Sequence, residues 1–232
     1  MTYVTRLTQT GGQPLEAPGS APQTVARTLP AVGDGSQERI GVFGGTFDPP
    51  HLGHLAIALD VAHELELDRV LLVVAGDPWQ KTAVRSITAA ADWLAMVRAA
   101  ADGCPGVEVS DIEIERDGPS YMADTLADLA DRHPDAALFL IVGSDAAAGL
   151  DTWSRPDAVR NQATTVVVDR GGREGGRPPE GWPHVVVDVP ALEVSSSDLR
   201  RRVRAGEPIR GLVPRAVADL IESAGHYTSE PV

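Results

Sequence analysis

Short apolar runs alternate with amphipathic segments along the chain from residue 39 onward. The apolar runs predict strands over 39–45, 69–76, 107–116, 137–143, 164–170 and 184–189. Apolar residues at helical spacing predict helices over 51–66, 88–101, 121–132, a short stretch after 143, 197–204 and 214–223. Strands that alternate with helices form a parallel sheet with helices on both faces. We therefore expect an α/β fold built on a doubly wound parallel sheet.

The ends of these strands are the natural places to look for a ligand site. In an open parallel sheet, ligands bind beyond the carboxyl ends of the strands. The loops of interest therefore follow Phe43, Ala75, Val142 and Arg170. The last of them leads into a glycine-rich stretch, residues 171–181, whose composition favours a flexible spacer over a lid.

Composition separates an N-terminal tail from one folded domain. Residues 1–36 are rich in Gly, Pro, Ser, Thr and Gln without periodicity, which predicts a flexible tail, with a docking peptide as the alternative. The remaining residues, 37–232, form the predicted domain. A chain of 232 residues with 43% hydrophobic and 23% charged residues suits one α/β domain.

The sequence also excludes several protein classes. No apolar run reaches the roughly 18 residues needed to cross a bilayer, and the N-terminus lacks the pattern of a secretion signal. The single cysteine, Cys104, excludes a disulfide framework and a Cys-based zinc site. We therefore expect a cytoplasmic protein with no membrane partner. The sequence does not determine the oligomeric state, and a homo-oligomer is compatible with it.

The charge of the chain argues against nucleic acid as a partner. The net charge is −13, whereas phosphate backbones favour diffuse positive charge. A small phosphorylated ligand is still compatible with this chain where its cations gather locally. Of the 20 basic residues, Lys81 is the one lysine.

The first predicted strand runs directly into a turn that suits a phosphate group. Its sequence is GGTFDPPHLGH, residues 44–54. Glycines let backbone N–H groups approach an anion, and the following helix N-terminus adds a positive dipole end. The turn has neither the GxGxxG nor the GxxxxGK[ST] pattern, so neither of those interpretations applies.

Two histidines, His51 and His54, lie three residues apart after this turn. That spacing places both imidazoles on one face of the first helical turn. Beside a phosphate, they can donate hydrogen bonds and stabilise charge as a P–O bond breaks. A zinc pair is the rival interpretation, but there is no cysteine or third ligand nearby, so we predict no metal-ligating residues. A pair of ordinary surface histidines is the other alternative.

The segment GGTFDPPHLGHL, residues 44–55, resembles the HxGH nucleotidyltransferases, and most of all the bacterial nicotinate-nucleotide adenylyltransferases. The similarity extends over residues 39–228. The resemblance implies a Rossmann-like fold, with ATP and a pyridine mononucleotide as the substrates. Phosphate would be held by backbone around Gly44, Gly45, Thr46 and Phe47, and the transferring group by the two histidines.

Four further segments carry the resemblance. In GDPWQK (76–81), Lys81 would contact the phosphates of ATP; a solvated surface lysine is the alternative. In DGPSYMADTL (117–126), Tyr121 would help wall the pyridine pocket. In LIVGSDAAAGLDTW (140–153), the strand ends in Gly143, and Asp145 would accept from a ribose hydroxyl. Trp153 would stack on the pyridine ring, although a tryptophan of the core is the common case.

The fourth segment, residues 189–214, contains the run SSSDLR. Ser195, Ser196 and Ser197 precede a helix, where hydroxyls and free N–H groups point at an anion, and the resemblance gives Ser196 and Arg200 contacts to the β and γ phosphates. Residues 199–215 contain six arginines and one acidic residue, Glu207, which predicts a local positive charge. An N-cap followed by a solvated arginine face is the alternative. The resemblance implies Mg²⁺ as the cofactor, bridging ATP phosphates with few or no protein ligands.

The chain departs from the family pattern at several positions. Asp92–Trp93 stand where the family usually has His-Arg, and Met122 where Thr is common. Ser144 and Gly171 replace a common Ala or Gln and a usual Pro, respectively. These departures cluster at positions that concern recognition of the acceptor and the placement of loops. Another acceptor, such as nicotinamide mononucleotide or phosphopantetheine, is therefore an open alternative. A nucleotide-binding relative without activity is the other.

Overall fold

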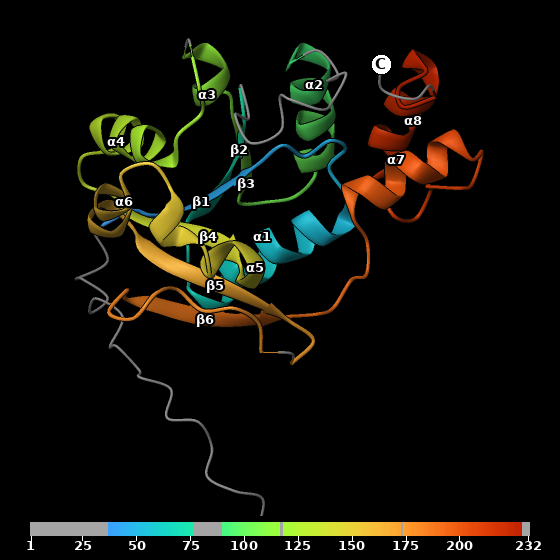
Figure 1. Cartoon of the computed structure of the whole chain (residues 1–232). Helices are drawn as coiled ribbons and strands as arrows, with labels where there is room; N and C mark the ends of the chain where they lie inside the picture. Colours follow the sequence, from blue (N-terminus) through green and yellow to red (C-terminus); the bar gives the residue numbers. More distant parts are fainter. Residues whose placement is uncertain (1–36, 77–89, 117, 173, 229–232) are drawn as a thin grey trace, which may run out of the picture.

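Six parallel strands form the centre of the structure, which is a computed structural model describing residues 37–76, 90–116, 118–172 and 174–228. The strands are β1 (Arg39–Gly45), β2 (Arg69–Val74), β3 (Val107–Ser110), β4 (Ala137–Gly143), β5 (Thr164–Arg170) and β6 (His184–Val189). Their order across the sheet is β3-β2-β1-β4-β5-β6, and every neighbouring pair is parallel. The predicted doubly wound parallel sheet is confirmed (Figure 1).

Helices cover both faces of this sheet. They are α1 (Leu52–Glu64), α2 (Ala90–Ala101), α3 (Ile112–Glu115), α4 (Met122–Arg132), α5 (Ser144–Ala147), the 3-10 turn η1 (Leu150–Thr152), α6 (Pro156–Gln162), α7 (Ser196–Arg204) and α8 (Arg215–Ala224). One core cluster contains side chains of α1, α2, α7 and α8, and the other contains those of α3, α4, α5 and α6. None of the described helices is long and apolar enough to cross a lipid bilayer.

The strand residues alternate between the two cores, as the pleat requires. In β2, Leu72 packs into the core of α1 and α2, whereas Leu71 and Val73 pack into the other one. This is why β2 is a continuous apolar run without a polar face.

One predicted strand is shorter than expected. The alternating sequence of 107–116 predicts a strand throughout, but β3 ends at Ser110 and residues 112–115 form α3. In an alternating strand of this sequence, the glutamates would face water. Instead Glu113 is buried, and its Oε1 accepts a hydrogen bond of 2.6 Å from the Thr125 hydroxyl. A buried carboxylate with such a partner no longer requires an extended segment with one wet face.

The order of the strands identifies the position of the site. The chain winds from β1 outward to β3, then crosses back to β4 on the other side of β1. Ligands in such sheets bind at the carboxyl ends of the strands where the winding reverses, here β1 and β4. In Figure 1, α7 and α8 (orange and red) lie together beyond that end of β1.

Candidate functional site

The glycine turn at the end of β1 is shaped by close contacts that exclude side chains. A Cβ on Gly44 would lie 2.7 Å from Cε of Met122, the first residue of α4. A Cβ on Gly45 would lie 3.0 Å from the Phe47 ring. Phe47 itself is buried with φ at 45°, in the left-handed region that a bulky residue rarely adopts. The turn is therefore held in one conformation by its surroundings.

The two histidines stack on one another immediately after this turn. The ring centroids of His51 and His54 are 3.6 Å apart, with an interplanar angle of 19°. The backbone N–H of His51 donates to Nδ1 of His54 at 3.2 Å, so a neutral His54 ring carries its proton on Nε2. The Phe47 ring also packs edge-on against the His54 ring, with centroids 5.0 Å apart and an interplanar angle of 85°.

The glycine between the histidines permits this stacking. A Cβ on Gly53 would lie 3.1 Å from Nδ1 of His51, which is tighter than ordinary contacts. The glycine of the HxGH pattern thus has a packing reason in this chain, independent of any ligand.

His51 is the most perturbed titratable group of the site. Burial, and secondarily the positive charge of Arg170, lower the pKa of His51 to about 4. Its Nδ1 is buried and has no hydrogen-bond partner among the described residues. The ring is therefore neutral near pH 7.

Helix α7 begins directly against the histidine turn. The Ser196 hydroxyl donates to the carbonyl oxygen of Pro49 at 2.9 Å. The Arg200 guanidinium donates to the carbonyl oxygen of Asp48, and it lies 3.6 Å from the carboxylate of the same residue. The structure thus brings together Ser196, Arg200 and the His51 turn, which lie about 150 positions apart in sequence.

The three serines at this helix start make different contacts. The helix begins at Ser196, one residue before the predicted start, and Ser195 is its N-cap. The Ser195 hydroxyl accepts from the N–H of Asp198 at 3.2 Å. The Ser197 hydroxyl accepts from Arg200 at 3.1 Å. Contacts of these hydroxyls with an anion stay a prediction.

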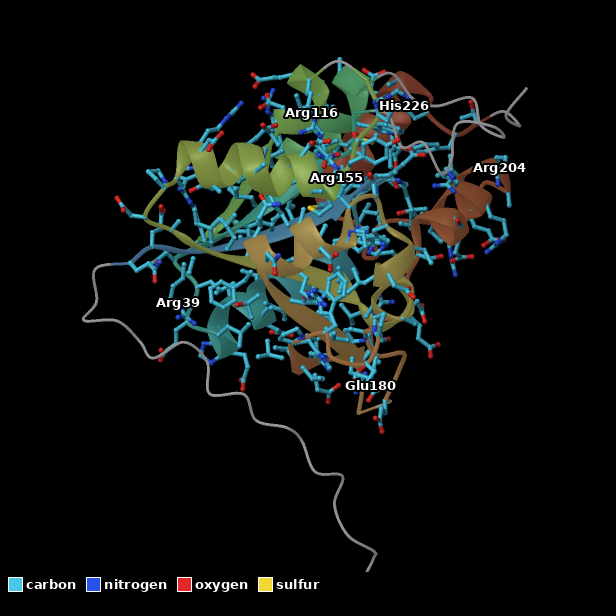
Figure 2. The ribbon with its side chains drawn as sticks, turned by 60° about the vertical axis from the view of Figure 1, so that its left-hand side comes forward. Arg39, Arg116, Arg155, Glu180, Arg204 and His226 are labelled. Carbon is cyan, nitrogen blue, oxygen red and sulfur yellow. The ribbon has the colours of Figure 1, made fainter. Side chains whose placement is uncertain are left out.

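In the folded chain, nearby carboxylates largely offset the positive charge predicted for residues 199–215. Five of the six arginines form ion pairs with carboxylates, four of which lie outside that window: Arg200 with Asp48, Arg201 and Arg202 with Asp198 and Glu207, Arg210 with Asp219 and Glu222, and Arg215 with Asp219. Arg204 lies at the outer edge of the molecule (Figure 2). Arg200 differs from all of these, because its side chain is only 12% exposed and faces the histidine turn.

A cleft of about 520 Å³ opens beside the histidines, at the carboxyl ends of β4 and β5. Its lining includes Gly143, Asp145, Arg170 and Ser195, so it brings together three residues that the sequence placed in an ATP site. A Cβ on Gly143 would meet no atom within 4 Å, which leaves room for a ligand to approach the backbone.

The glycine-rich stretch after β5 forms part of the cleft wall. Glu174 and Gly175 line the cleft, and a Cβ on Gly176 would lie 2.7 Å from the Ser144 carbonyl oxygen. Arg177 pairs with Asp169 at 2.6 Å and, through that bond, lowers the pKa of the Asp169 carboxyl. This part of the predicted spacer is therefore anchored to the sheet beside the cleft.

Tyr121 and Trp153 come from the segments that flank α4 and η1. Tyr121 immediately precedes Met122, whose side chain contacts Gly44. Trp153 is half-buried against the core of α4 and α6. An ion pair between Arg155 and Asp124 joins the segment after Trp153 to the first turn of α4, and Figure 2 shows Arg155 beside that helix. The two predicted pyridine-binding residues thus come from adjoining segments.

Two predictions concern residues outside the described part of the chain, and two residues of the site were not predicted. Lys81 and the tail, residues 1–36, lie outside the described residues. No role was predicted for Asp48 or Arg170 from the sequence. Arg170 lines the cleft and also a small adjoining cavity that contains His51. Its position at the carboxyl end of a strand was the signal that could have identified it.

Comparison with known proteins gives a consistent result. Residues 42–202 match the family model described as cytidylyltransferase-like. A probable nicotinate-nucleotide adenylyltransferase of Corynebacterium kroppenstedtii is 44% identical over 82% of this chain and 90% of its own length. A protein of the same description from Saccharopolyspora erythraea is 41% identical over 84% of this chain and 92% of its own.

A solved structure shares the fold. The nicotinic acid mononucleotide adenylyltransferase of Plasmodium falciparum, solved in complex with NaAD, superposes with a TM-score of 0.69 at 17% identity. The match covers 82% of this chain and 98% of that one. At such low identity the likeness concerns the fold alone.

Proposed function

The chain belongs to the cytidylyltransferase-like family and, within it, to the nicotinate-nucleotide adenylyltransferases, and on this premise we propose that it transfers the adenylyl group of ATP to nicotinate mononucleotide. The products are nicotinate adenine dinucleotide and pyrophosphate, in the synthesis of NAD. The observation that carries the proposal is the contact of Ser196 and Arg200 with the turn that ends in His51. It places groups suited to a triphosphate around one point.

The proposed reaction is a direct displacement. A 5′-phosphate oxygen of the mononucleotide forms a bond to the α-phosphorus of ATP, and the bond from that phosphorus to the pyrophosphate oxygen breaks. A phosphate monoester is already a competent nucleophile, so the protein needs to position the two substrates and neutralise charge.

The histidines act on the transferring group. His54 donates from Nε2, since its Nδ1 accepts a backbone N–H, and neutral His51 offers one further hydrogen bond from a ring whose burial keeps it uncharged. Donors that are already in place stabilise the charge that develops on the phosphoryl oxygens. Backbone N–H groups of Gly44, Gly45 and Thr46 are the proposed cradle for phosphate.

The remaining site residues bind the ends of the two substrates. Ser196 and Arg200, together with Lys81, contact the β and γ phosphates. The cleft beside Gly143, Asp145 and Ser195 accepts the adenosine, with Asp145 on the ribose.

The pyridine ring of the acceptor lies between two other segments. We propose that Tyr121 and Trp153 form its pocket, with the Trp153 indole stacking on the ring.

Magnesium would arrive with ATP. Among the described residues, no group of three or more His, Cys, Asp or Glu side chains is placed to hold a metal ion. We propose that the donors for Mg²⁺ are chiefly the phosphate oxygens of ATP, where the ion would neutralise part of their charge.

The test is pyrophosphate release by the purified protein with ATP, Mg²⁺ and a panel of acceptors. We expect the highest kcat/KM with nicotinate mononucleotide, compared with nicotinamide mononucleotide and phosphopantetheine, and nicotinate adenine dinucleotide as the product. A higher kcat/KM with either of the other acceptors would replace the proposed substrate. ATP binding without pyrophosphate release in the presence of any acceptor would refute the proposal that the protein is an enzyme.

A further inference from the structure

Asp48 is the point at which three distant segments meet. The Trp93 indole N–H, from α2, donates to Oδ1 of Asp48 at 2.8 Å, across 45 positions of sequence. The Tyr227 hydroxyl, from the segment after α8, donates to the same oxygen at 2.5 Å, across 179 positions. Asp48 and Trp93 are 7% and 2% exposed, so the Trp93 bond is buried, whereas the Tyr227 bond is partly buried.

The other groups of Asp48 face the site. Its second carboxylate oxygen lies 3.6 Å from the Arg200 guanidinium, which also donates to the Asp48 carbonyl oxygen. The next carbonyl, of Pro49, accepts from Ser196, and His51 follows two residues later. Asp48 thus connects the α7 cation with the backbone that carries the histidines.

The kind of donor on Oδ1 matters for this arrangement. A buried carboxylate must be hydrogen-bonded, and each missing bond leaves a desolvated oxygen. Trp93 and Tyr227 supply those bonds without adding a charge. The carboxylate is thereby fixed in orientation, and its other oxygen is directed at the Arg200 guanidinium.

We propose that Trp93 and Tyr227 are positioning residues for adenylyl transfer, which act by orienting Asp48 and, through it, Arg200 and the His51 turn. This inference rests on the proposed function. It also gives a physical role to Trp93, one of the positions at which this sequence departs from the family pattern.

The test uses Trp93→Phe and Tyr227→Phe in the full chain. Each substitution removes one donor from Asp48 and keeps an aromatic ring. We expect kcat/KM for ATP to fall about tenfold in each variant, because small displacements of catalytic groups are costly. The Kd of ATP measured by calorimetry should rise about threefold, and the Kd of nicotinate mononucleotide should stay within twofold.

Trp182→Phe is the matched control. The Trp182 indole N–H donates to the Thr165 hydroxyl at 2.9 Å, and the side chain is 7% exposed in the core of the other face. This variant loses an equivalent buried bond far from Asp48. We expect it to lower Tm about as much as Trp93→Phe and to leave kcat/KM within twofold of wild type.

A second arm tests the route through Arg200. In an Arg200→Ala background, Trp93→Phe should lower kcat/KM by clearly less than tenfold, because one of the two groups that it orients is gone. A full tenfold loss in that background would overturn the route. Equal Tm losses for Trp93→Phe and Trp182→Phe, with kcat/KM and ATP affinity unchanged in both, would show a purely structural role. The activity of the wild-type protein distinguishes failure of the positioning role from failure of the proposed function. An inactive wild-type protein refutes the function, whereas the ATP affinities of the variants still decide the positioning role.

Discussion

At the scale of single residues, the two histidines of the site differ in surroundings although they stack on one another. His51 is buried and lies near Arg170, whereas His54 is half-buried with its Nδ1 already accepting a backbone N–H. The burial of His51 affects the pH dependence of stability. The bond to Nδ1 of His54 leaves its Nε2 as the nitrogen that we propose donates to a substrate.

His51 should make the protein less stable in mild acid. Its pKa is about 4 in the fold against an ordinary 6.5, so between these values the unfolded chain binds more protons than the folded one. Stability therefore falls as pH drops from 6.5 towards 4, by about 2 kcal/mol between pH 7 and 4.5. Urea unfolding of His51→Gln across this range should lack that portion of the slope. His63→Gln, at an exposed position of the same helix, is the control and should retain it.

His54→Ala should lower kcat by about 10²-fold or more, since it removes a donor placed at the transferring phosphoryl group. Steady-state pyrophosphate release measures the effect, with His63→Ala expected to stay within twofold of wild type. Wild-type turnover in His54→Ala would remove this histidine from the mechanism.

At the scale of elements, α7 carries two kinds of arginine. Arg200 is nearly buried and faces the turn, whereas Arg201 and Arg202 pair with carboxylates of their own helix and of Glu207. Exposed ion pairs of this kind contribute little to binding or stability. The helix therefore offers the site one cation rather than a charged face.

Substituting the arginines of α7 one at a time should show this difference. We expect Arg200→Ala to lower kcat/KM for ATP about 10²-fold, and Arg204→Ala, at the outer edge of the helix, to change it less than twofold. Equal losses in the two variants would mean that diffuse charge, and not the placement of Arg200, attracts the triphosphate. Raising the salt concentration would then weaken both variants alike.

The pyridine pocket proposed at Tyr121 and Trp153 should affect the binding of one substrate only. We expect Trp153→Ala to raise the Kd of nicotinate mononucleotide about tenfold, the order expected for a lost ring contact, and to leave the Kd of ATP within twofold. Trp153→Phe keeps a flat ring and should recover most of the affinity. Calorimetric titration of each ligand measures both constants, and equal losses for the two would make Trp153 a structural residue.

At the scale of the whole molecule, the sequence pattern was sufficient for the sheet and insufficient for particular side-chain pairs. The strands β1, β2, β4 and β5 were predictable because a strand buried on both faces is largely a run of apolar residues. The edge strand β6 was predictable from its run of valines, although Val186 is exposed. The meeting of Ser196 with the His51 turn was predictable in outline, since the carboxyl ends of parallel strands share one edge.

Other features depend on contacts that no local pattern records. The helix α3 replaces a predicted strand because Glu113 has a buried partner in Thr125. The positive charge of the arginines in 199–215 is largely offset by Asp48, Asp198, Asp219 and Glu222, which lie outside the stretch that was considered. The partners of Asp48 are 45 and 179 positions away, so only the folded chain reveals them.

The bond from Tyr227 to Asp48 has a consequence for how the protein is made. A ribosome completes the glycine turn and both histidines long before residue 227 emerges, so the nascent chain carries the whole motif while its carboxylate still lacks one donor. With the positioning role proposed above, the site gains its full activity only when the residues that follow α8 are in place. Chains cut short within α8, by premature termination or by proteases, would keep every signature residue and still be poor enzymes.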